Sequence, residues 1–268
     1  MQASIQPRLA SVRDFMSKHV QTISSGSTVD EAINKMAKHN VGSLVVMGGL
    51  GPKGLLSERD LVSKLVATGK TPEKTLVTEV MSGQITRFHP EQSLREAAQI
   101  MNSLRNRLLV FEDDHIIGIV TATDIVRGIH EMNYTFDIDK GTMKSVYTVK
   151  NETSLKEAIE VMSQLRIGSL ITMKNDEPDG IFTEWDLVRN VLAPHLALES
   201  HVGDQASRPL MTAEEGIGGR QAASIMTINH IKRLPLTRRG VIAGIVTARD
   251  LVEAFACSQT TDAIRTRS

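Results

Sequence analysis

The sequence predicts an α/β fold made of four copies of one unit with the order strand, helix, strand, strand, helix. One short string occurs four times, a helix-start pattern precedes each copy, and short apolar runs lie on both sides of it. Together these features indicate a repeat of about 60 residues that organises most of the chain.

The recurring string begins with Gly and ends with Ser or Thr followed three residues later by Asp. Its copies are GLLSERD from Gly54, GIVTATD from Gly118, GIFTEWD from Gly180 and GIVTARD from Gly244. The final aspartates, Asp60, Asp124, Asp186 and Asp250, are spaced 64, 62 and 64 residues apart. Near-constant spacing is typical of repeats of one structural unit.

Upstream of each string, the residues predict an amphipathic helix. Thr28, Ser93 and Ser154 are followed three residues later by Glu, and Gly218 by Gln, as in a capping box. Four and eight residues past each cap stand Ala and Met, which share one helical face. We expect this face to be buried, with Ala allowing a close approach and Met filling the core.

Each helix leads into two predicted strands and a second helix. The middle strands are expected in GSLVVM from Gly42, RLLVF from Arg107, GSLIT from Gly168 and RLPL from Arg233. These runs are short and rich in Val, Ile and Leu, and a second run joined by a hairpin ends in the recurring string. Beyond each aspartate, apolar residues at i, i+4 predict the second helix.

The repeats alternate in type, which predicts a pairing. Odd repeats start the middle strand with Gly-Ser and carry Glu after the Ser or Thr of the string, whereas even repeats carry Arg and Ala at these places. A repeat of about 60 residues is marginally stable alone, so the repeats should pack together. The predicted repeats cover about 11–70, 76–132, 136–196 and 200–257, forming modules at 11–132 and 136–257 with tails at 1–10 and 258–268.

Composition excludes several classes of protein. Lys+Arg and Asp+Glu both number 31, so the chain is not built mainly to wrap nucleic acid. Cys257 is the single cysteine, and no apolar run approaches the roughly 18 residues of a membrane span, so a cytoplasmic protein without membrane contact is expected. The histidines lack HExxH-type spacing and no nucleophile accompanies a base, so we expect neither a metal site nor an enzyme.

The recurring string allows two interpretations. The hydroxyl and the Asp could simply form a capping box at a helix start. The same geometry could clamp a ribose phosphate, because the helix N-terminus and the hydroxyl suit a phosphate and the carboxylate accepts hydrogen bonds from ribose hydroxyls. Gly has no side chain, so it would permit close approach by a ligand or by a neighbouring backbone.

The repeat order, the GxxTxxD string and the pairing resemble the cystathionine-β-synthase (CBS) domain, two copies of which form a Bateman module. The resemblance covers about residues 11 to 257 and implies a site in clefts between paired repeats for AMP, ADP, ATP or S-adenosylmethionine. It implies ribose contacts from the four aspartates and phosphate contacts from Ser57, Thr121, Thr183 and Thr247. The RLLV and KRLPL segments are also similar to a strand of the γ subunit of AMP-activated protein kinase. A His common in that strand is replaced here by Asn106 and Lys232.

Four cationic residues, Arg107, Lys232, Arg233 and Arg249, could contact the phosphates or could be solvated surface charges. The stretch from Gly216 to Arg249 contains six basic residues and no acid, which would suit a phosphate-rich ligand, an RNA or an acidic protein surface.

Two functions follow as hypotheses. The first is a non-catalytic regulatory protein that needs no cofactor, binds an adenosyl ligand and signals to a protein or ribonucleoprotein partner through rearrangement of its modules. The alternative is a scaffold or inhibitor that binds the ribosome, an RNA or an enzyme through its surface, with the ligand sites secondary. A homodimer is compatible with both.

Overall fold

The structure is a computed structural model that describes residues 10–104, 106–138 and 143–258. The chain divides into two compact units that interleave along the sequence. The even unit comprises Met1–Val20, Thr86–Ser145 and Thr212–Ser268, and the odd unit comprises Gln21–Ile85 and Val146–Met211. Each unit is considered by itself.

Every repeat contains one three-stranded sheet, in which the first strand pairs parallel with the middle strand and the middle strand pairs antiparallel with the third. The sheets are β1 (Thr22–Ser24), β2 (Ser43–Gly48) and β3 (Gly51–Ser57); β4 (Thr86–Phe88), β5 (Leu108–Glu112) and β6 (His115–Val120); β7 (Thr148–Lys150), β8 (Ser169–Lys174) and β9 (Glu177–Thr183); and β10 (Ala213–Glu214), β11 (Arg233–Arg238) and β12 (Val241–Thr247). All four hairpins shift register at the same place, directly before the Gly of the recurring string. The predicted order of elements is confirmed in each repeat.

The helix between the first and middle strands begins at the predicted cap in all four repeats. These helices are α2 (Val29–His39), α5 (Leu94–Leu104), α7 (Leu155–Gln164) and α10 (Gly219–Ile228). Thr28 Oγ1 accepts a hydrogen bond from the Glu31 backbone N–H at 3.3 Å, and the Glu31 carboxylate accepts one from the Thr28 backbone N–H at 3.1 Å. The predicted Ala and Met positions are buried, so the amphipathic pattern is confirmed. No helix within the described ranges is long and apolar enough to cross a membrane.

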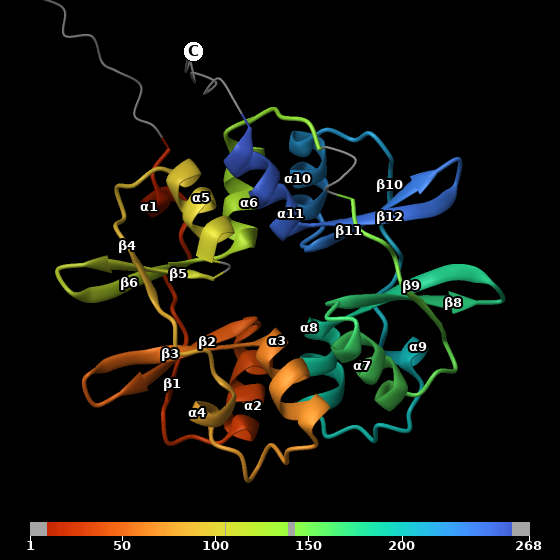
Figure 1. The fold of residues 1–268 in the computed structure, drawn as a ribbon, viewed down its shortest axis with the longest axis horizontal. Helices are drawn as coiled ribbons and strands as arrows, with labels where there is room; N and C mark the ends of the chain where they lie inside the picture. Colours follow the sequence, from red (N-terminus) through yellow and green to blue (C-terminus); the bar gives the residue numbers. More distant parts are fainter. Residues whose placement is uncertain (1–9, 105, 139–142, 259–268) are drawn as a thin grey trace, which may run out of the picture. The chain divides into compact units, whose positions relative to one another are not determined.

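The even unit has one core shared by its two repeats. After the recurring string, α6 (Ala122–Glu131) and α11 (Ala248–Cys257) are regular α-helices, and they pack with α5 and α10 (Figure 1). The Tyr134 and Phe136 rings lie 5.0 and 5.9 Å from the Phe255 ring, centroid to centroid. Helices from residues about 130 positions apart in the chain thus form one apolar interior.

In the odd unit the second helix is present but changes its helical type after one turn. One α-helical turn, α3 (Glu58–Asp60) or α8 (Glu184–Asp186), continues as a wider π-helix, η1 (Leu61–Leu65) or η4 (Leu187–Leu192), and η1 is followed by the 3-10 turn η2 (Val66–Thr68). Val62 packs in the core around α7, whereas Val188 packs in the core around α2. The predicted second helix is therefore present in both odd repeats, and its π-helical part carries a valine that packs in the other repeat's core.

A short segment, which we call the lead-in, precedes the first strand of each repeat. The lead-in belongs to one unit, and the strand that follows it belongs to the other unit. Within the described residues, helical turns lie in the lead-ins of repeats 1, 2 and 4, namely α1 (Val12–Phe15), α4 (Val77–Val80) and α9 (Val202–Gln205). The lead-ins end at residues 17, 82, 144 and 207, where each pairs with the third strand of a sheet. Repeats 1 and 2 exchange lead-ins, as do repeats 3 and 4. The predicted modules at 11–132 and 136–257 each contain segments of both units, so that pairing stays a prediction, and most of the predicted tails lies outside the described residues.

Candidate functional site at the strand-to-helix junctions

The Ser or Thr of each recurring string is the N-cap of the following helix. Its hydroxyl lies 2.5 to 2.7 Å from Oδ2 of the Asp three residues later, in the pairs Ser57–Asp60, Thr121–Asp124, Thr183–Asp186 and Thr247–Asp250. The same Oδ2 accepts the backbone N–H of the Ser or Thr at 2.8 to 2.9 Å. In three copies the hydroxyl also accepts the backbone N–H of the Asp, at 3.2 to 3.4 Å, which completes a capping box. At Thr121 the Asp124 N–H bonds to the Thr121 carbonyl oxygen instead.

The other carboxylate oxygen, Oδ1, faces the last residue of a lead-in. Ser82 donates its hydroxyl to Asp60 at 3.0 Å, Ser17 to Asp124 at 3.1 Å and Ser207 to Asp186 at 2.8 Å. In the fourth copy, the ammonium of Lys144 contacts Asp250 instead. Each motif Asp thus joins a helix start to a segment that arrives from another part of the chain.

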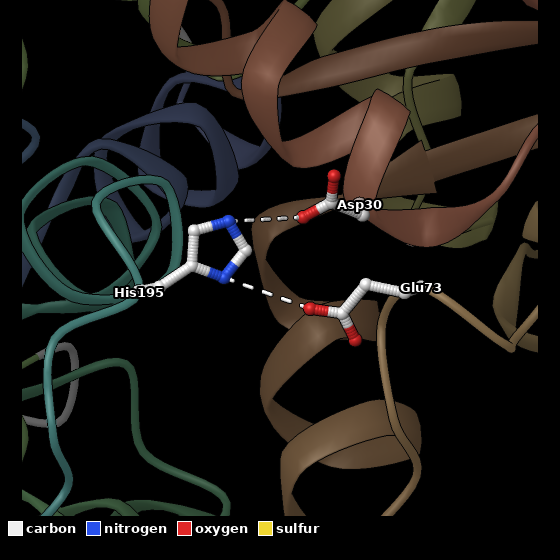
Figure 2. A group of neighbouring side chains, drawn as sticks. All are labelled: Asp30, Glu73 and His195. Carbon is white, nitrogen blue, oxygen red and sulfur yellow. Dashed lines mark ion pairs between the residues drawn. The ribbon is translucent and has the colours of Figure 1, made fainter.

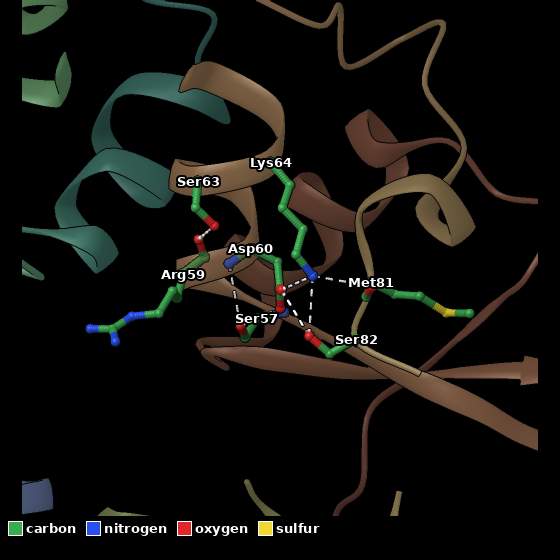
Figure 3. Close-up of polar contacts among 7 residues, drawn as sticks. All are labelled: Ser57, Arg59, Asp60, Ser63, Lys64, Met81 and Ser82. Carbon is green, nitrogen blue, oxygen red and sulfur yellow. Dashed lines mark hydrogen bonds and ion pairs between the residues drawn. The ribbon is translucent and has the colours of Figure 1, made fainter. Parts of the chain in front are cut away.

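Figure 3 shows this arrangement in the first repeat. Lys64 Nζ lies 2.7 Å from Asp60 Oδ1, 3.2 Å from the Ser82 hydroxyl and 3.3 Å from the Met81 carbonyl oxygen. Arg59 points away from this cluster and forms an ion pair with Glu184 at 3.2 Å. Lys64 therefore contacts both the motif carboxylate and the lead-in, and links them.

The Gly that opens each string makes room for the same lead-in. A Cβ on Gly54 would lie 2.5 Å from the Ser82 carbonyl oxygen, and one on Gly118 would lie 2.4 Å from the Met16 sulfur. The absence of a side chain on this glycine could admit either a ligand or a neighbouring backbone. In the structure, the lead-in occupies the space.

All four motif aspartates are buried, with exposures of 6% for Asp60, 3% for Asp124, 5% for Asp186 and 1% for Asp250. Burial raises the pKa of Asp124 above its ordinary value, while hydrogen bonds from Thr121 and Ser17 and the charge of Arg127 oppose this rise. The Arg127 guanidinium lies 3.2 Å from Asp124 Oδ1. These donors thus offset part, but not all, of the cost of burying the carboxylate.

The predicted cationic residues gather at the same junctions. Arg233 begins β11 and stands opposite Thr247 in register, and the Lys232 carbonyl oxygen accepts the first backbone N–H of α11, from Ala248, at 2.8 Å. Arg249 lies in the first turn of α11, and Arg107 directly precedes β5. All four of these basic residues make contacts within the protein. The structure therefore brings Lys232, Arg233 and Arg249 to one junction, in the fourth repeat.

A separate cluster in the odd unit joins three distant segments. His195 Nε2 lies 3.5 Å from Asp30 Oδ1, and His195 Nδ1 lies 3.6 Å from Glu73 Oε1 (Figure 2). Asp30 Oδ1 is buried and accepts no hydrogen bond from the part of the chain that the structure describes. These three donors could hold a divalent cation. The two ring nitrogens of His195 face different carboxylates, so the imidazole lies between Asp30 and Glu73.

The sequence identified the hydroxyl, carboxylate and glycine of each junction but not the lead-in residues that meet them. A signal was present, because Met-Ser occurs at Met16 and at Met81 shortly before a predicted first strand. The His195 cluster has no such signal, since its members are 43 residues or more apart in the sequence. Whether the junctions contact ribose and phosphate stays a prediction.

The chain was compared with protein families and with known proteins. A family model described as "CBS domain" matches residues 12–67, 77–131, 137–193 and 202–257. CBS domain-containing protein YhcV of Bacillus subtilis is 35% identical over 118 residues, which are 44% of this chain and 84% of the relative. Protein MK0525 of Methanopyrus kandleri is 34% identical over 123 residues, and the match spans 45% of this chain and 63% of that relative.

Among solved structures, protein MJ1225 of Methanocaldococcus jannaschii, described as a proposed archaeal homolog of g-AMPK, superposes with a TM-score of 0.75. It is 19% identical, and the match covers 92% of this chain and 100% of that one. At this identity the likeness concerns the fold.

Proposed function

Because the chain belongs to the CBS-domain family, we propose that it is a non-catalytic regulatory protein that binds an adenosyl ligand at its strand-to-helix junctions. The candidate ligands are AMP, ADP, ATP and S-adenosylmethionine. A partner protein or ribonucleoprotein would read the liganded state.

One observation carries this proposal: all four junctions keep a hydroxyl and a carboxylate side by side at a helix start. A structural cap needs only one acceptor oxygen for the helix N–H groups. Here Oδ2 serves the cap, and Oδ1 is directed to side chains of a lead-in, whose hydrogen bonds a ligand hydroxyl could replace or share. The junction thus has one carboxylate oxygen for the fold and one for a ligand.

The proposed roles divide by chemistry. Oδ1 of Asp60, Asp124, Asp186 or Asp250 accepts hydrogen bonds from ribose hydroxyls. The hydroxyls of Ser57, Thr121, Thr183 and Thr247 turn from Oδ2 to donate to the first phosphate at the positive end of a helix dipole, while Oδ2 keeps the backbone N–H of the same residue. Charge-assisted hydrogen bonds to further phosphates come from Arg107, Lys232, Arg233 and Arg249.

Signalling requires that the ligand bind one arrangement of the protein more tightly than another, because only differential affinity shifts an equilibrium. The lead-ins supply the physical link. A ribose hydroxyl that replaces Ser17, Ser82 or Ser207 as the donor to the motif carboxylate loosens the lead-in to which that serine belongs. The repeat that follows this lead-in continues in the other unit. A partner that contacts either unit would detect this change.

Titration calorimetry of the whole protein with AMP, ADP, ATP and S-adenosylmethionine tests the proposal. The variants are Asp60→Asn, Asp124→Asn and Asp186→Asn, with Asp114→Asn as the matched control because the Asp114 side chain is 89% exposed. We expect binding of at least one ligand and a loss of about tenfold or more in affinity in at least one junction variant that still folds, since a charged hydrogen bond is worth about 1.5–3 kcal/mol. Absence of binding by all four ligands would contradict the proposal. The alternative, a scaffold for a macromolecular partner, would then be supported by salt-sensitive capture of RNA or ribosomal subunits.

A further inference from the structure

The fourth junction differs from the other three at the last residue of its lead-in. Ser17, Ser82, Lys144 and Ser207 end the four lead-ins, and each exchanges two backbone hydrogen bonds with the residue after the string's Gly. The N···O distances of these bonds are 2.8 to 3.1 Å in all four copies. Identical backbone pairing places each side chain beside the motif carboxylate, so the chemistry there depends on the residue type.

Three of these side chains are hydroxyls and one is an ammonium. A serine hydroxyl is neutral, rotates, and can donate to the carboxylate while accepting from a ligand. The Lys144 ammonium is a donor only, carries a full charge, and contacts Asp250 Oδ1. A ribose hydroxyl at Asp250 would have to displace this ammonium or share Oδ1 with it, whereas the lead-ins of the other junctions present only a neutral hydroxyl.

Burial makes that competition unequal. Asp250 is the least exposed of the four motif aspartates, at 1%, while the Lys144 side chain is 57% exposed. If Asp250 exchanged its charged partner for neutral ribose hydroxyls, part of the free-energy cost of burying its carboxylate would no longer be compensated. The ion pair thus opposes ribose binding at Asp250.

Cations near the other junctions act differently. Lys64 and Arg127 come from the same helix as Asp60 and Asp124 and lie next to Ser82 and Ser17, which still donate to Oδ1. Only Lys144, among the residues that the structure describes at the ends of lead-ins, takes the place of the serine.

From these contacts we propose that Lys144 closes the fourth junction to ribose, so that the adenosyl ligand is bound at junctions formed by Asp60, Asp124 or Asp186 and not at Asp250. Thr247, Lys232, Arg233 and Arg249 lie at this closed junction, so the phosphate contacts proposed for them belong to the site that opens when Lys144 is replaced. This inference rests on the proposed function. It predicts that the substitution Lys144→Ser, which restores the residue of the other lead-ins, opens one additional site.

The test compares AMP stoichiometry, measured by titration calorimetry on the full chain, in the wild type, Lys144→Ser and the double variant Lys144→Ser/Asp250→Asn. We expect one more equivalent of AMP per chain in Lys144→Ser than in the wild type, and loss of that equivalent in the double variant. Asp250→Asn in the wild-type background should leave AMP stoichiometry unchanged. Lys144→Gln serves if Lys144→Ser does not fold, because it also removes the charge.

The reverse substitution Ser17→Lys provides the matched variant at Asp124. If Asp124 is an occupied junction, Ser17→Lys should remove one equivalent of AMP, and Ser82→Lys and Ser207→Lys test Asp60 and Asp186 in the same way. At least one of these three must lose an equivalent.

The outcomes separate the two proposals. AMP binding with the same stoichiometry in Lys144→Ser and the wild type overturns the role of Lys144 and leaves the proposed function standing. Weaker AMP binding in Lys144→Ser also overturns it, since Lys144 would then contact the ligand's phosphate. No binding of any adenosyl ligand by any variant overturns both.

Discussion

At the scale of single residues, the recurring chemistry of each junction already has a structural role: its glycine, hydroxyl and carboxylate all make contacts within the protein. Gly54 and Gly118 admit a lead-in, the hydroxyl caps a helix, and the Asp holds both. Such dual use explains why a capping box and a ribose-phosphate clamp could not be separated from the sequence. Both need the same residue types at the same spacing.

The raised pKa of Asp124 predicts a pH dependence of stability. The folded protein holds the Asp124 proton more tightly than the unfolded chain does, because burial raises this pKa. The free energy of unfolding contributed by Asp124 is therefore fully present below the ordinary pKa of about 3.9 and is lost as the pH rises through the folded-state value.

Urea denaturation of the wild type and Asp124→Asn between about pH 4 and pH 7 measures this effect, because the substituted side chain does not titrate. The wild type should gain stability relative to Asp124→Asn as the pH is lowered. A constant difference would contradict the assignment, and Asp114→Asn, at an exposed carboxylate, should show no such trend.

Two glycines predict losses of stability of different size for the same substitution. Gly54→Ala places a Cβ against the Ser82 backbone oxygen, which cannot move away, whereas Gly118→Ala places it against the flexible Met16 side chain. We expect Gly54→Ala to cost about 1–3 kcal/mol and Gly118→Ala to cost less. Adding Met16→Ala should relieve the strain of Gly118→Ala in a double-mutant cycle, while Met81→Ala should leave most of the Gly54→Ala strain in place. Equal coupling in both pairs, measured by chemical denaturation, would refute this explanation.

At the scale of elements, most of the fold was predictable from local patterns. Capping boxes located four helices, and short apolar runs located the strands, because both signals act over a few residues. The π-helical turns were not predictable, since Leu61 with Leu65 and Leu187 with Val191 show the same i, i+4 spacing as the regular helices of the even unit. Their distinguishing feature is the packing of Val62 and Val188, which depends on residues far away in the sequence.

Val62 and Val188 each pack in the core of the other repeat, which predicts energetic coupling between the two repeats of the odd unit. Val188 belongs to repeat 3 but packs in the core around α2 of repeat 1. Val188→Ala should therefore reduce amide hydrogen-exchange protection in α2, with a cost of roughly 2 kcal/mol from lost burial and the cavity left behind. Val191→Ala is the matched control, because Val191 packs in the core of its own repeat. Unchanged protection in α2 of Val188→Ala would show that this packing has no energetic weight.

At the scale of the whole molecule, the sequence-based pairing and the compact units divide the chain differently. The predicted modules follow the chain, whereas each unit combines helices of alternate repeats. A sequence shows which face of each helix is apolar. It does not show which two helices bury these faces against each other, because that depends on residues far apart in the chain. The exchanged lead-ins, by contrast, link repeats 1 with 2 and 3 with 4, as the predicted modules do.

The shared core of the even unit predicts the behaviour of a half-length fragment. A fragment of residues 1–132 retains α5 and α6 but lacks α10 and α11, which cover them in the full chain. The uncovered apolar faces should drive self-association, since contiguous exposed apolar surface is unfavourable in water. Light scattering coupled to size exclusion should give a dimer or larger species, and a well-folded monomer would contradict the importance of the shared core.

The most direct test of the central claim is a crystal structure of the protein grown with AMP. The account predicts ribose hydroxyls on Oδ1 of Asp60, Asp124 or Asp186, the phosphate beside the capping hydroxyl, and Lys144 still paired with Asp250. AMP bound away from every strand-to-helix junction, with all four carboxylates contacting only their lead-ins, would contradict it.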